Sequence, residues 1–218
     1  MTSTPSRRDY DRSRRQATSD ATRQRILDAA RSIVIRHGYR GTKVADIASA
    51  SDVHVATVYA LVGRKPVMLR ELIERAISGA DRAVPADERD YVIAMRATAE
   101  PRRKLAIYAK AMGAIHVRLA PLLLALRDAA TTEPEAAAVW RDISERRATN
   151  MRRLVEDLQH AGGLRHDLPI EDAADFVWAT NSPELYTLMC VERSWTPDHY
   201  EAWLVDLWSR YLLPGGHR

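Results

Sequence analysis

The chain has 218 residues, of which 46% are hydrophobic and 28% are charged. This is the composition of an ordinary soluble globular protein, and the length suffices for one large or two small domains. No apolar run approaches the roughly 18–20 residues that cross a bilayer, and the charged N-terminus lacks the apolar segment of a secretory signal. The single cysteine, Cys190, excludes a disulfide within the chain. We therefore expect a cytoplasmic protein with no membrane partner.

The charge is unevenly distributed along the chain. Residues 1–80 contain 15 Lys and Arg against 8 Asp and Glu, which gives +7, whereas residues 81–218 contain 18 against 21, which gives −3. A basic N-terminal third joined to a slightly acidic remainder indicates a polyanionic partner for the first part only, with chance scatter of charge as the alternative.

Residues 1–18 are polar and rich in arginine. They can bury too little apolar surface to stay folded alone, so we predict a disordered basic arm over this stretch. Its arginines are Arg7, Arg8, Arg12, Arg14 and Arg15.

Four helices are predicted to follow the arm. Apolar residues at helical spacing predict the first over residues 20–37, and Gly38 is expected to end it. The turn "YRGT" leads to Thr42, which we expect to cap a short second helix at about 43–49. A third helix is expected at about 54–61 and is ended by Gly63, and Pro66 suits the first turn of a fourth helix.

From the polar stretch "PADERD" (85–90) onward, almost every segment has helical periodicity. Residues 105–126 form a continuous apolar seam, in which Pro121 predicts a kink or a division into two helices. Further helices are predicted over about 134–160, over about 170–192 with an interruption near Ser182-Pro183, and over about 197–212. No segment alternates like a strand and no internal repeat occurs, so the predicted fold class is all-α.

The two short helices form a helix-turn-helix pattern, because a turn of about four residues joins them and the first helix braces them. The second helix of such a unit enters the DNA major groove, so its N-terminal end must be slim. Val55, Ala56 and Thr57 are small enough, and their methyl groups can touch a thymine. Tyr59 and Lys65 suit phosphates. The alternative is a short surface helix in an ordinary bundle, with Tyr59 packed sideways.

Residues 24–72 resemble the DNA-binding region of TetR-family transcriptional repressors. The resemblance is carried by "RILDAARSIVIRHGY" (25–39), "TKVADIASASDV" (42–53) and "ATVYALVGRKPVML" (56–69). It implies a homodimeric, ligand-responsive repressor that binds a palindromic operator and is released by a small apolar or amphipathic effector. Activation is the less usual alternative in the family. Such a protein is cytoplasmic, and nucleoid-associated when bound to DNA.

The predicted fold therefore has an N-terminal three-helix helix-turn-helix DNA-binding domain and a C-terminal helical ligand-binding and dimerisation domain. The expected ranges are a disordered basic arm over 1–18, the DNA-binding domain over 19–65, a connecting fourth helix over 66–84, and the ligand-binding and dimerisation domain over 85–218.

The helix-turn-helix departs from the family pattern in places. Asp52 stands where Gly is usual, which makes a left-handed backbone conformation less comfortable. His54 replaces the usual Ser and is a poorer N-cap, and Leu61-Val62 replaces an aromatic pair. Lys43 stands where Ser or Thr is common, and we expect it and His54 to add a phosphate or guanine contact. The predicted DNA contacts are Thr42, Lys43, His54, Val55, Ala56, Thr57, Tyr59 and Lys65.

The arginine-rich arm has two interpretations within this framework. It is either a tail without a role, or an arm that enters an adjacent minor groove and adds salt-dependent affinity.

The resemblance implies an effector cavity and a two-fold dimer in the C-terminal part. Polar or aromatic residues within apolar helices are the expected cavity residues, although each is also an ordinary core residue type. These are Tyr108, Met112, His116, Trp140, Trp178, Asn181 and Tyr186. Large apolar residues cover more than one face of the last helix, which predicts a four-helix bundle shared between two subunits. The expected interface residues are Trp203, Leu204, Leu207, Trp208 and Tyr211.

Catalytic signatures are missing from the sequence. Cys190 has no Cys-His signature, and His160, His166 and Asp167 match no strong metal motif. No phosphate-binding loop, GxSxG or GxGxxG occurs. We therefore expect no enzyme, no cofactor and no metal.

The alternative to a DNA-binding regulator and to an enzyme is a third class of protein. It is an all-helical protein-interaction or ligand-sensing module without sequence-specific DNA binding. The small residues 55–57, the presence of Tyr59 and Lys65, and the basic N-terminal part argue against it.

Overall fold

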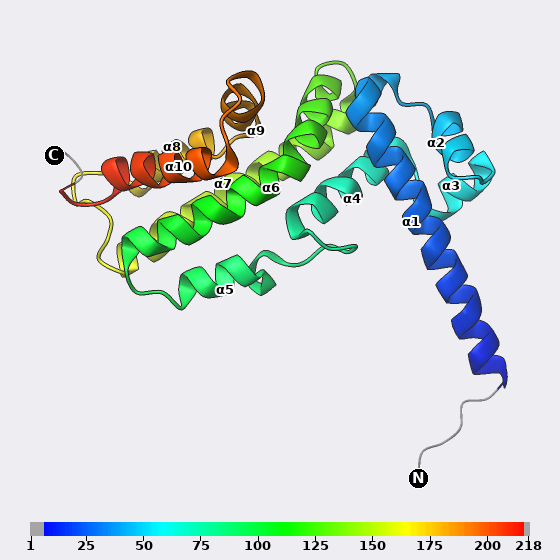
Figure 1. Cartoon of the computed structure of the whole chain (residues 1–218), viewed down its shortest axis with the longest axis horizontal. Helices are drawn as coiled ribbons and strands as arrows, with labels where there is room; N and C mark the ends of the chain where they lie inside the picture. Colours follow the sequence, from blue (N-terminus) through cyan, green and yellow to red (C-terminus); the bar gives the residue numbers. More distant parts are fainter. Residues whose placement is uncertain (1–6, 216–218) are drawn as a thin grey trace, which may run out of the picture. The chain divides into compact units, whose positions relative to one another are not determined.

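The computed structural model describes residues 7–215, and every regular element in that range is helical (Figure 1). This confirms the predicted all-α class. The chain divides into two compact units, Met1–Leu72 and Ile73–Arg218. The division falls within helix α4 (Lys65–Ser78), which begins beside the predicted Pro66 and ends before the expected limit at residue 84.

The N-terminal unit consists of α1 (Arg7–Gly41), α2 (Val44–Ala50), α3 (Val55–Leu61) and the first turns of α4. α1 packs against both α2 and α3, and α2 packs against α3. The burial of apolar side chains from all four helices supplies the main stabilisation of this small unit. Fully or almost fully buried are Ile26, Leu27, Ala30, Ile47, Val58 and Leu69.

Gly38 bends the chain near the end of α1. Its φ of 69° lies in the left-handed region that favours glycine, as expected for the residue that ends the predicted helix. The bend turns Tyr39 into the core, where it is 2% exposed. The Thr42 hydroxyl donates to the Gly38 carbonyl at 2.7 Å, so the predicted cap by Thr42 is wrong. Lys43 takes the N-cap position of α2, without a side-chain cap bond.

α1 begins at Arg7, well before the predicted start at residue 20. Residues 7–18 are therefore helical rather than disordered, and residues 1–6 of the expected arm lie outside the described residues. No Gly or Pro occurs between Pro5 and Gly38, so nothing in the sequence stops the helix from extending. Gln16 donates to Asp20 one turn ahead at 3.0 Å, which is the kind of pair that supports an exposed helix.

The C-terminal unit is built around two long helices, α6 (Pro101–Ala130) and α7 (Pro134–His160), which pack side by side (Figure 1). α10 (Pro197–Leu212) packs along α6, and α8 (Ile170–Thr180) packs along α7. A short 3₁₀ turn (Ala86–Glu88) precedes α5 (Asp90–Arg96), which packs on α6. The core between these helices buries Leu105, Leu122, Leu126, Ile143, Val155, Leu158 and Trp208.

Pro121 does not divide α6, so the predicted division into two helices is wrong, and the alternative of a kink stays a prediction. A proline at this position cannot donate to the carbonyl of Val117. The side chain of Val117 is 54% exposed, so this turn lies at the surface, where water can bind the carbonyl. Leu119, Leu122 and Leu123 are buried on either side of the proline, and their packing holds the helix together.

α6 is long and apolar enough to cross a membrane by length and mean hydropathy, although no unbroken apolar run suggested it. Of its most apolar window, 61% is buried inside the unit. The apolar residues therefore serve as the central core of the C-terminal unit.

The predicted interruption near Ser182-Pro183 is confirmed. α8 ends at Thr180, and the Ser182 hydroxyl accepts from the Leu185 amide at 3.2 Å to cap α9 (Pro183–Tyr186). A π-helical turn over Thr187–Glu192 follows. It ends near Ser194, whose φ of 55° is left-handed.

The last helix, α10, has the bounds expected from the sequence. Its large apolar residues form two rows along the helix, and neighbours within each row are one turn apart. Leu204 and Trp208 are fully buried within the chain, and the indole of Trp208 donates to the Thr180 hydroxyl at 2.8 Å. Their assignment to a dimer interface is therefore wrong, because their side chains are already used in the core. Trp203, Leu207 and Tyr211 are half-buried and stay available to a partner.

Candidate nucleic-acid interface and effector cavity

Helix α3 presents a small, uncharged surface to solvent. Val55 and Tyr59 are 40% and 49% exposed, and Ala56 is also exposed, whereas Val58 is fully buried. Residues four apart share one face of a helix, so Val55 and Tyr59 lie one above the other on the outer face. The helix thus offers short side chains at its N-terminal end and one long polar aromatic side chain a turn later.

The turn before α3 has the strained geometry that the sequence predicts. Asp52 adopts a φ of 53°, where the family pattern has Gly. The Val53 amide donates to the Ala48 carbonyl at 3.0 Å and closes the turn. His54 is the N-cap of α3, but its side chain makes no cap bond, as expected for a poor N-cap. The exposed His54 imidazole is consequently available for an outside contact.

Arg23 of α1 holds the C-terminal end of α3 in place. Its Nε donates to the Leu61 carbonyl at 3.1 Å, and its two terminal nitrogens bind the Glu71 carboxylate at 2.5 Å each. A two-fold guanidinium–carboxylate pair is geometrically selective. Three helices therefore meet at Arg23, and this fixes the direction in which α3 points.

The other residues predicted to contact DNA differ in how far their side chains are exposed to solvent. Lys43 is exposed at the start of α2, and Thr57 is half-buried. Lys65, at the start of α4, places its ammonium 4.2 Å from the centre of the Tyr39 ring. Thr42 is 3% exposed, and its hydroxyl and amide both donate inside the unit. Thr42 therefore presents no free donor to DNA, and its assignment to the DNA contacts is wrong.

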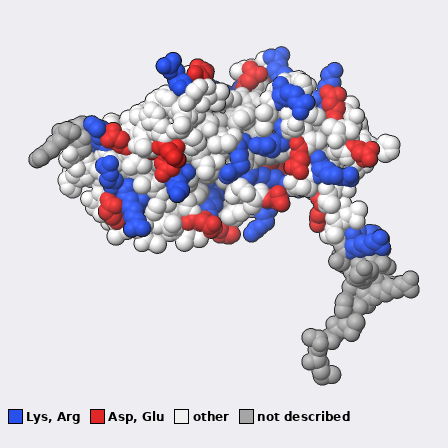
Figure 2. All heavy atoms as spheres, viewed as in Figure 1, with Lys and Arg blue, Asp and Glu red and all other residues white. Residues whose placement is uncertain are grey.

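Basic and acidic side chains are interspersed over the face of the molecule shown in Figure 2, without a continuous basic patch there. The excess of positive charge in residues 1–80 therefore adds a general attraction to a polyanion.

The C-terminal unit forms a partly open cavity of about 140 Å³ between α5, α6, α7 and the end of α8. The larger part of its wall is apolar and comes from α6 and α7. These residues are Met112, Ile115, Leu119, Leu123, Ile143, Met151 and Leu154. Such an apolar cavity with a few polar groups is typical of a small-molecule site.

A small polar network lies in the cavity wall. The Asn181 amide donates to the Tyr108 hydroxyl at 2.7 Å, and this hydroxyl donates to the Met151 sulfur at 3.1 Å. Burial raises the pKa of Tyr108 well above its usual value, so the phenol stays neutral. The side-chain Oδ1 of Asn181, in contrast, is buried without a hydrogen-bond partner among the described residues.

His116 is the second polar group with an unused atom in this wall. It is 3% exposed and stacks on Tyr186 with ring centres 5.5 Å apart, and its Nδ1 has no partner in the described part of the chain. Burial and the nearby charge of Arg147 lower the pKa of His116 to about 3. The imidazole is therefore neutral at physiological pH. A buried polar atom without a partner is costly, and a ligand can supply one.

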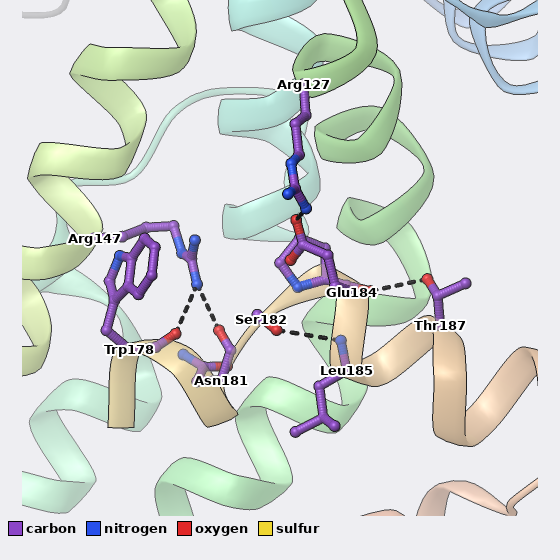
Figure 3. Close-up of polar contacts among 9 residues, drawn as sticks. Arg127, Arg147, Trp178, Asn181, Ser182, Glu184, Leu185 and Thr187 are labelled. Atoms are coloured by element: carbon purple, nitrogen blue, oxygen red, sulfur yellow. Dashed lines mark hydrogen bonds and ion pairs between the residues drawn. The ribbon is translucent and has the colours of Figure 1, made fainter. Parts of the chain in front are cut away.

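Arg147 of α7 brings a positive charge into the cavity wall. One terminal nitrogen donates to the carbonyls of Asn181 at 2.6 Å and Trp178 at 3.3 Å, and the guanidinium lies 5.2 Å from the Trp178 ring (Figure 3). Burial lowers the pKa of Arg147, and the interactions with Tyr108 and Glu184 offset this in part.

The predicted cavity residues are brought together only in part. Tyr108, Met112, His116 and Asn181 line the cavity, and contact of each with an effector stays a prediction. Trp178 and Tyr186 stand behind it, under Arg147 and His116. Trp140 is half-buried and is not part of the lining.

Arg147 was missed from the sequence, although a signal for it exists. Ile143, Arg147 and Met151 are spaced by four residues, so Arg147 falls on the buried face of an otherwise apolar stripe. A charged residue at such a position indicates either a structural bond or a ligand site.

The arrangement defines a class of protein, a helix-turn-helix DNA-binding unit joined to a helical unit with a small-molecule cavity. Residues 26–72 match the family model "Bacterial regulatory proteins, tetR family". The N-terminal helix-turn-helix unit is therefore similar to the DNA-binding domain of this family of regulators.

Solved structures similar to this chain have the same fold. The fatty acid degradation regulator FadR from Bacillus halodurans is 20% identical, with a TM-score of 0.66 over 89% of this chain and 95% of its own. FadR from Bacillus subtilis, in complex with stearoyl-CoA, is 18% identical, with a TM-score of 0.69 over 85% and 97%. A transcriptional regulator from Saccharomonospora viridis, in complex with choline, is 20% identical, with a TM-score of 0.66 over 88% and 97%. No curated protein sequence matches the chain.

The residues that the structure describes contain no group of three or more His, Cys, Asp or Glu side chains arranged to hold a metal ion. His166 and Asp167 lie on the exposed surface, and Asp167 pairs with Arg165.

Proposed function

We propose that the protein is a homodimeric repressor that binds a palindromic operator through α3 and releases it when a small molecule occupies the cavity of the C-terminal unit. The observation that carries the proposal is the exposed, uncharged outer face of α3, held in place by Arg23. An α-helix with short side chains at its N-terminal end fits the major groove, and Tyr59 suits the flanking backbone.

The dimer part of the proposal rests on α10. Trp203, Leu207 and Tyr211 form a half-buried apolar row along one face, and Tyr211 stacks on Phe176 of α8 with ring centres 3.8 Å apart. Two copies of this surface packed about a two-fold axis make a four-helix bundle of α8 and α10. The two α3 helices of a dimer must then lie about 34 Å apart to contact successive major grooves.

The effector part rests on the cavity and its unused polar atoms. Two structures with the same fold are complexes with stearoyl-CoA and with choline, which supports the proposal that this chain binds a small molecule. An effector changes DNA binding only to the extent that it binds one of two conformations more tightly. We expect the effector to favour a conformation in which the two α3 helices no longer match the half-sites.

A gel-shift experiment with DNA from upstream of the protein's own gene tests this function. We expect the purified protein to retard this DNA at moderate salt and to resist competition by an excess of unrelated duplex. Equal competition by both DNAs would contradict sequence-selective binding.

A further inference from the structure

Arg147 is a half-buried cation whose hydrogen bonds go to neutral groups. The guanidinium donates to the main-chain carbonyls of Trp178 and Asn181, and it lies against the Trp178 ring (Figure 3). Among the described residues, Glu184 is the acid whose charge acts on Arg147, and this carboxylate already pairs with Arg127. Arg147 therefore lacks a counter-ion of its own in the described part of the cavity wall.

The other charges around the cavity add to the positive potential. Arg89, Arg96 and Arg153 line it together with Arg147, against Asp87 and Asp157. Asp157 accepts from the buried Lys104 at 2.7 Å, so its charge is compensated locally. Because a low-dielectric wall strengthens electrostatic interactions, an anionic group that enters this cavity is favoured over a cation.

The polar atoms beside Arg147 are suited to bind the same anionic group. His116 is neutral, and the Nδ1 of its imidazole has no partner among the described residues, so this ring offers an uncharged polar atom to a ligand. The rest of the wall is formed by Met, Ile and Leu side chains. The site thus combines one cation and one neutral polar ring with an apolar wall.

We propose that the effector is a small carboxylate with an apolar body, and that Arg147 binds its carboxylate. This inference rests on the proposed role of the cavity as the effector site. The cavity of about 140 Å³ is comparable to the roughly 150 Å³ engineered cavity that holds one benzene, but it is partly open, so the end of a longer alkyl chain can extend toward solvent. A guanidinium suits a carboxylate because it can offer two parallel hydrogen bonds.

Carboxylate binding at Arg147 also affects α8, which we assign to the dimer interface. The guanidinium now satisfies carbonyls at the C-terminal end of α8, just before the break at Asn181. A carboxylate competes with these carbonyls for the same donors. Binding therefore changes the conformation at the end of α8. This change connects the cavity to the proposed subunit interface.

Titration calorimetry with the full-length protein, in the absence of DNA, tests which ligand charge the cavity prefers. The probes are octanoate, 1-octanol and octyltrimethylammonium, which share one alkyl chain. We expect octanoate to bind roughly ten- to hundredfold more tightly than 1-octanol, the effect of one charged hydrogen-bonded pair, and the cation to bind weakest. Equal binding of acid and alcohol, or tighter binding of the cation, would overturn the proposal.

Three variants assign the preference to Arg147. Arg147→Gln should remove the preference for octanoate over octanol while octanol still binds, and Arg147→Lys should keep part of it. Arg141→Gln, an exposed position on the same helix, is the matched control and should bind as the wild type does. Since replacement of Arg147 can unfold the end of α8, the comparison of probes on the wild-type protein stands without the variants. An unchanged octanoate preference in a folded Arg147→Gln protein refutes the assignment.

DNA binding is measured separately, so that the two proposals fail in different ways. If octanoate binds through Arg147 but does not change retardation of DNA, the carboxylate site stands and the effector-controlled part of the function fails. If no probe binds while DNA is still retarded, the carboxylate proposal fails and DNA binding stands.

Discussion

His116 carries a neutral imidazole in the cavity wall, and this has a consequence for stability. Its pKa is about 3 in the folded protein and 6.5 in an ordinary environment, so between these values the unfolded chain binds one more proton than the folded one. The folded state therefore loses stability as the pH falls below 6.5. The desolvated ring is the physical cause, together with the positive charge of Arg147.

We expect His116→Phe to reduce this acid sensitivity. At pH 5 the protonation of His116 in the unfolded chain costs about 2 kcal/mol, so the drop in unfolding free energy between pH 7 and pH 5 should be smaller in the variant by about this amount. Urea unfolding at the two pH values measures it. His166→Phe changes an exposed histidine and serves as the control. An equal drop in wild type and His116→Phe would contradict the buried, neutral imidazole.

Asp52 holds the turn before α3 in a left-handed conformation that glycine adopts more easily. With a φ of 53°, Asp52→Gly should raise the free energy of unfolding by about 0.5–1 kcal/mol. Asp46→Gly, in the first turn of α2, should lower it by a similar amount, because Gly weakens a helix and an acidic side chain near the helix N-terminus is lost. Thermal unfolding of both variants provides the measurement. Destabilisation by Asp52→Gly would mean that the Asp side chain stabilises the turn more than its φ strains it.

Among the helices, the N-terminal extension of α1 raises the question of what its arginines do. The helix begins at Arg7, and Arg14 and Arg15 are exposed on it. Deletion of residues 1–16 should reduce the salt dependence of DNA binding, because each phosphate that these arginines neutralise adds about one unit to the logarithmic slope. Affinities of both proteins over a range of KCl concentrations measure this. An unchanged slope would show that the extension does not bind DNA.

The helices also differ in how well the sequence predicts them. The bounds of α7 and α10 were predicted closely, because each starts with Pro at the first turn and each has an unbroken apolar period. The predicted division at Pro121 does not occur, because buried leucines on both sides hold α6 together. Local propensity cannot report such tertiary packing.

The two candidate sites also differ in how much of each could be predicted from the sequence. The outer face of α3 follows from local spacing, so Val55, Ala56 and Tyr59 were predicted and are exposed. The cavity is assembled from α5, α6, α7 and the end of α8, and the sequence alone does not place these helices side by side. Arg147 was missed for this reason, and Leu204 and Trp208 were assigned to a partner rather than to the chain's own core.

For the molecule as a whole, the proposed function requires a dimer. Leu207→Glu places a charge in the half-buried row of α10 and should produce a monomer with weakened operator binding, because both half-sites are then no longer bound together. Ile93→Glu, at a position 53% exposed on α5, is the control and should remain a dimer. Light scattering after size exclusion gives the masses. A wild-type monomer, or a dimeric Leu207→Glu protein, would contradict the proposed interface.

Binding of a specific DNA sequence by a dimer through α3 can be measured by selection from a pool of random DNA duplexes. The wild-type protein should enrich an inverted repeat with half-site centres about 10 base pairs apart, or a multiple of the helical turn. Tyr59→Ala, which removes an exposed side chain, should enrich the same repeat much less efficiently. Enrichment of no sequence by the wild-type protein, or equal enrichment by Tyr59→Ala, would contradict operator recognition through α3.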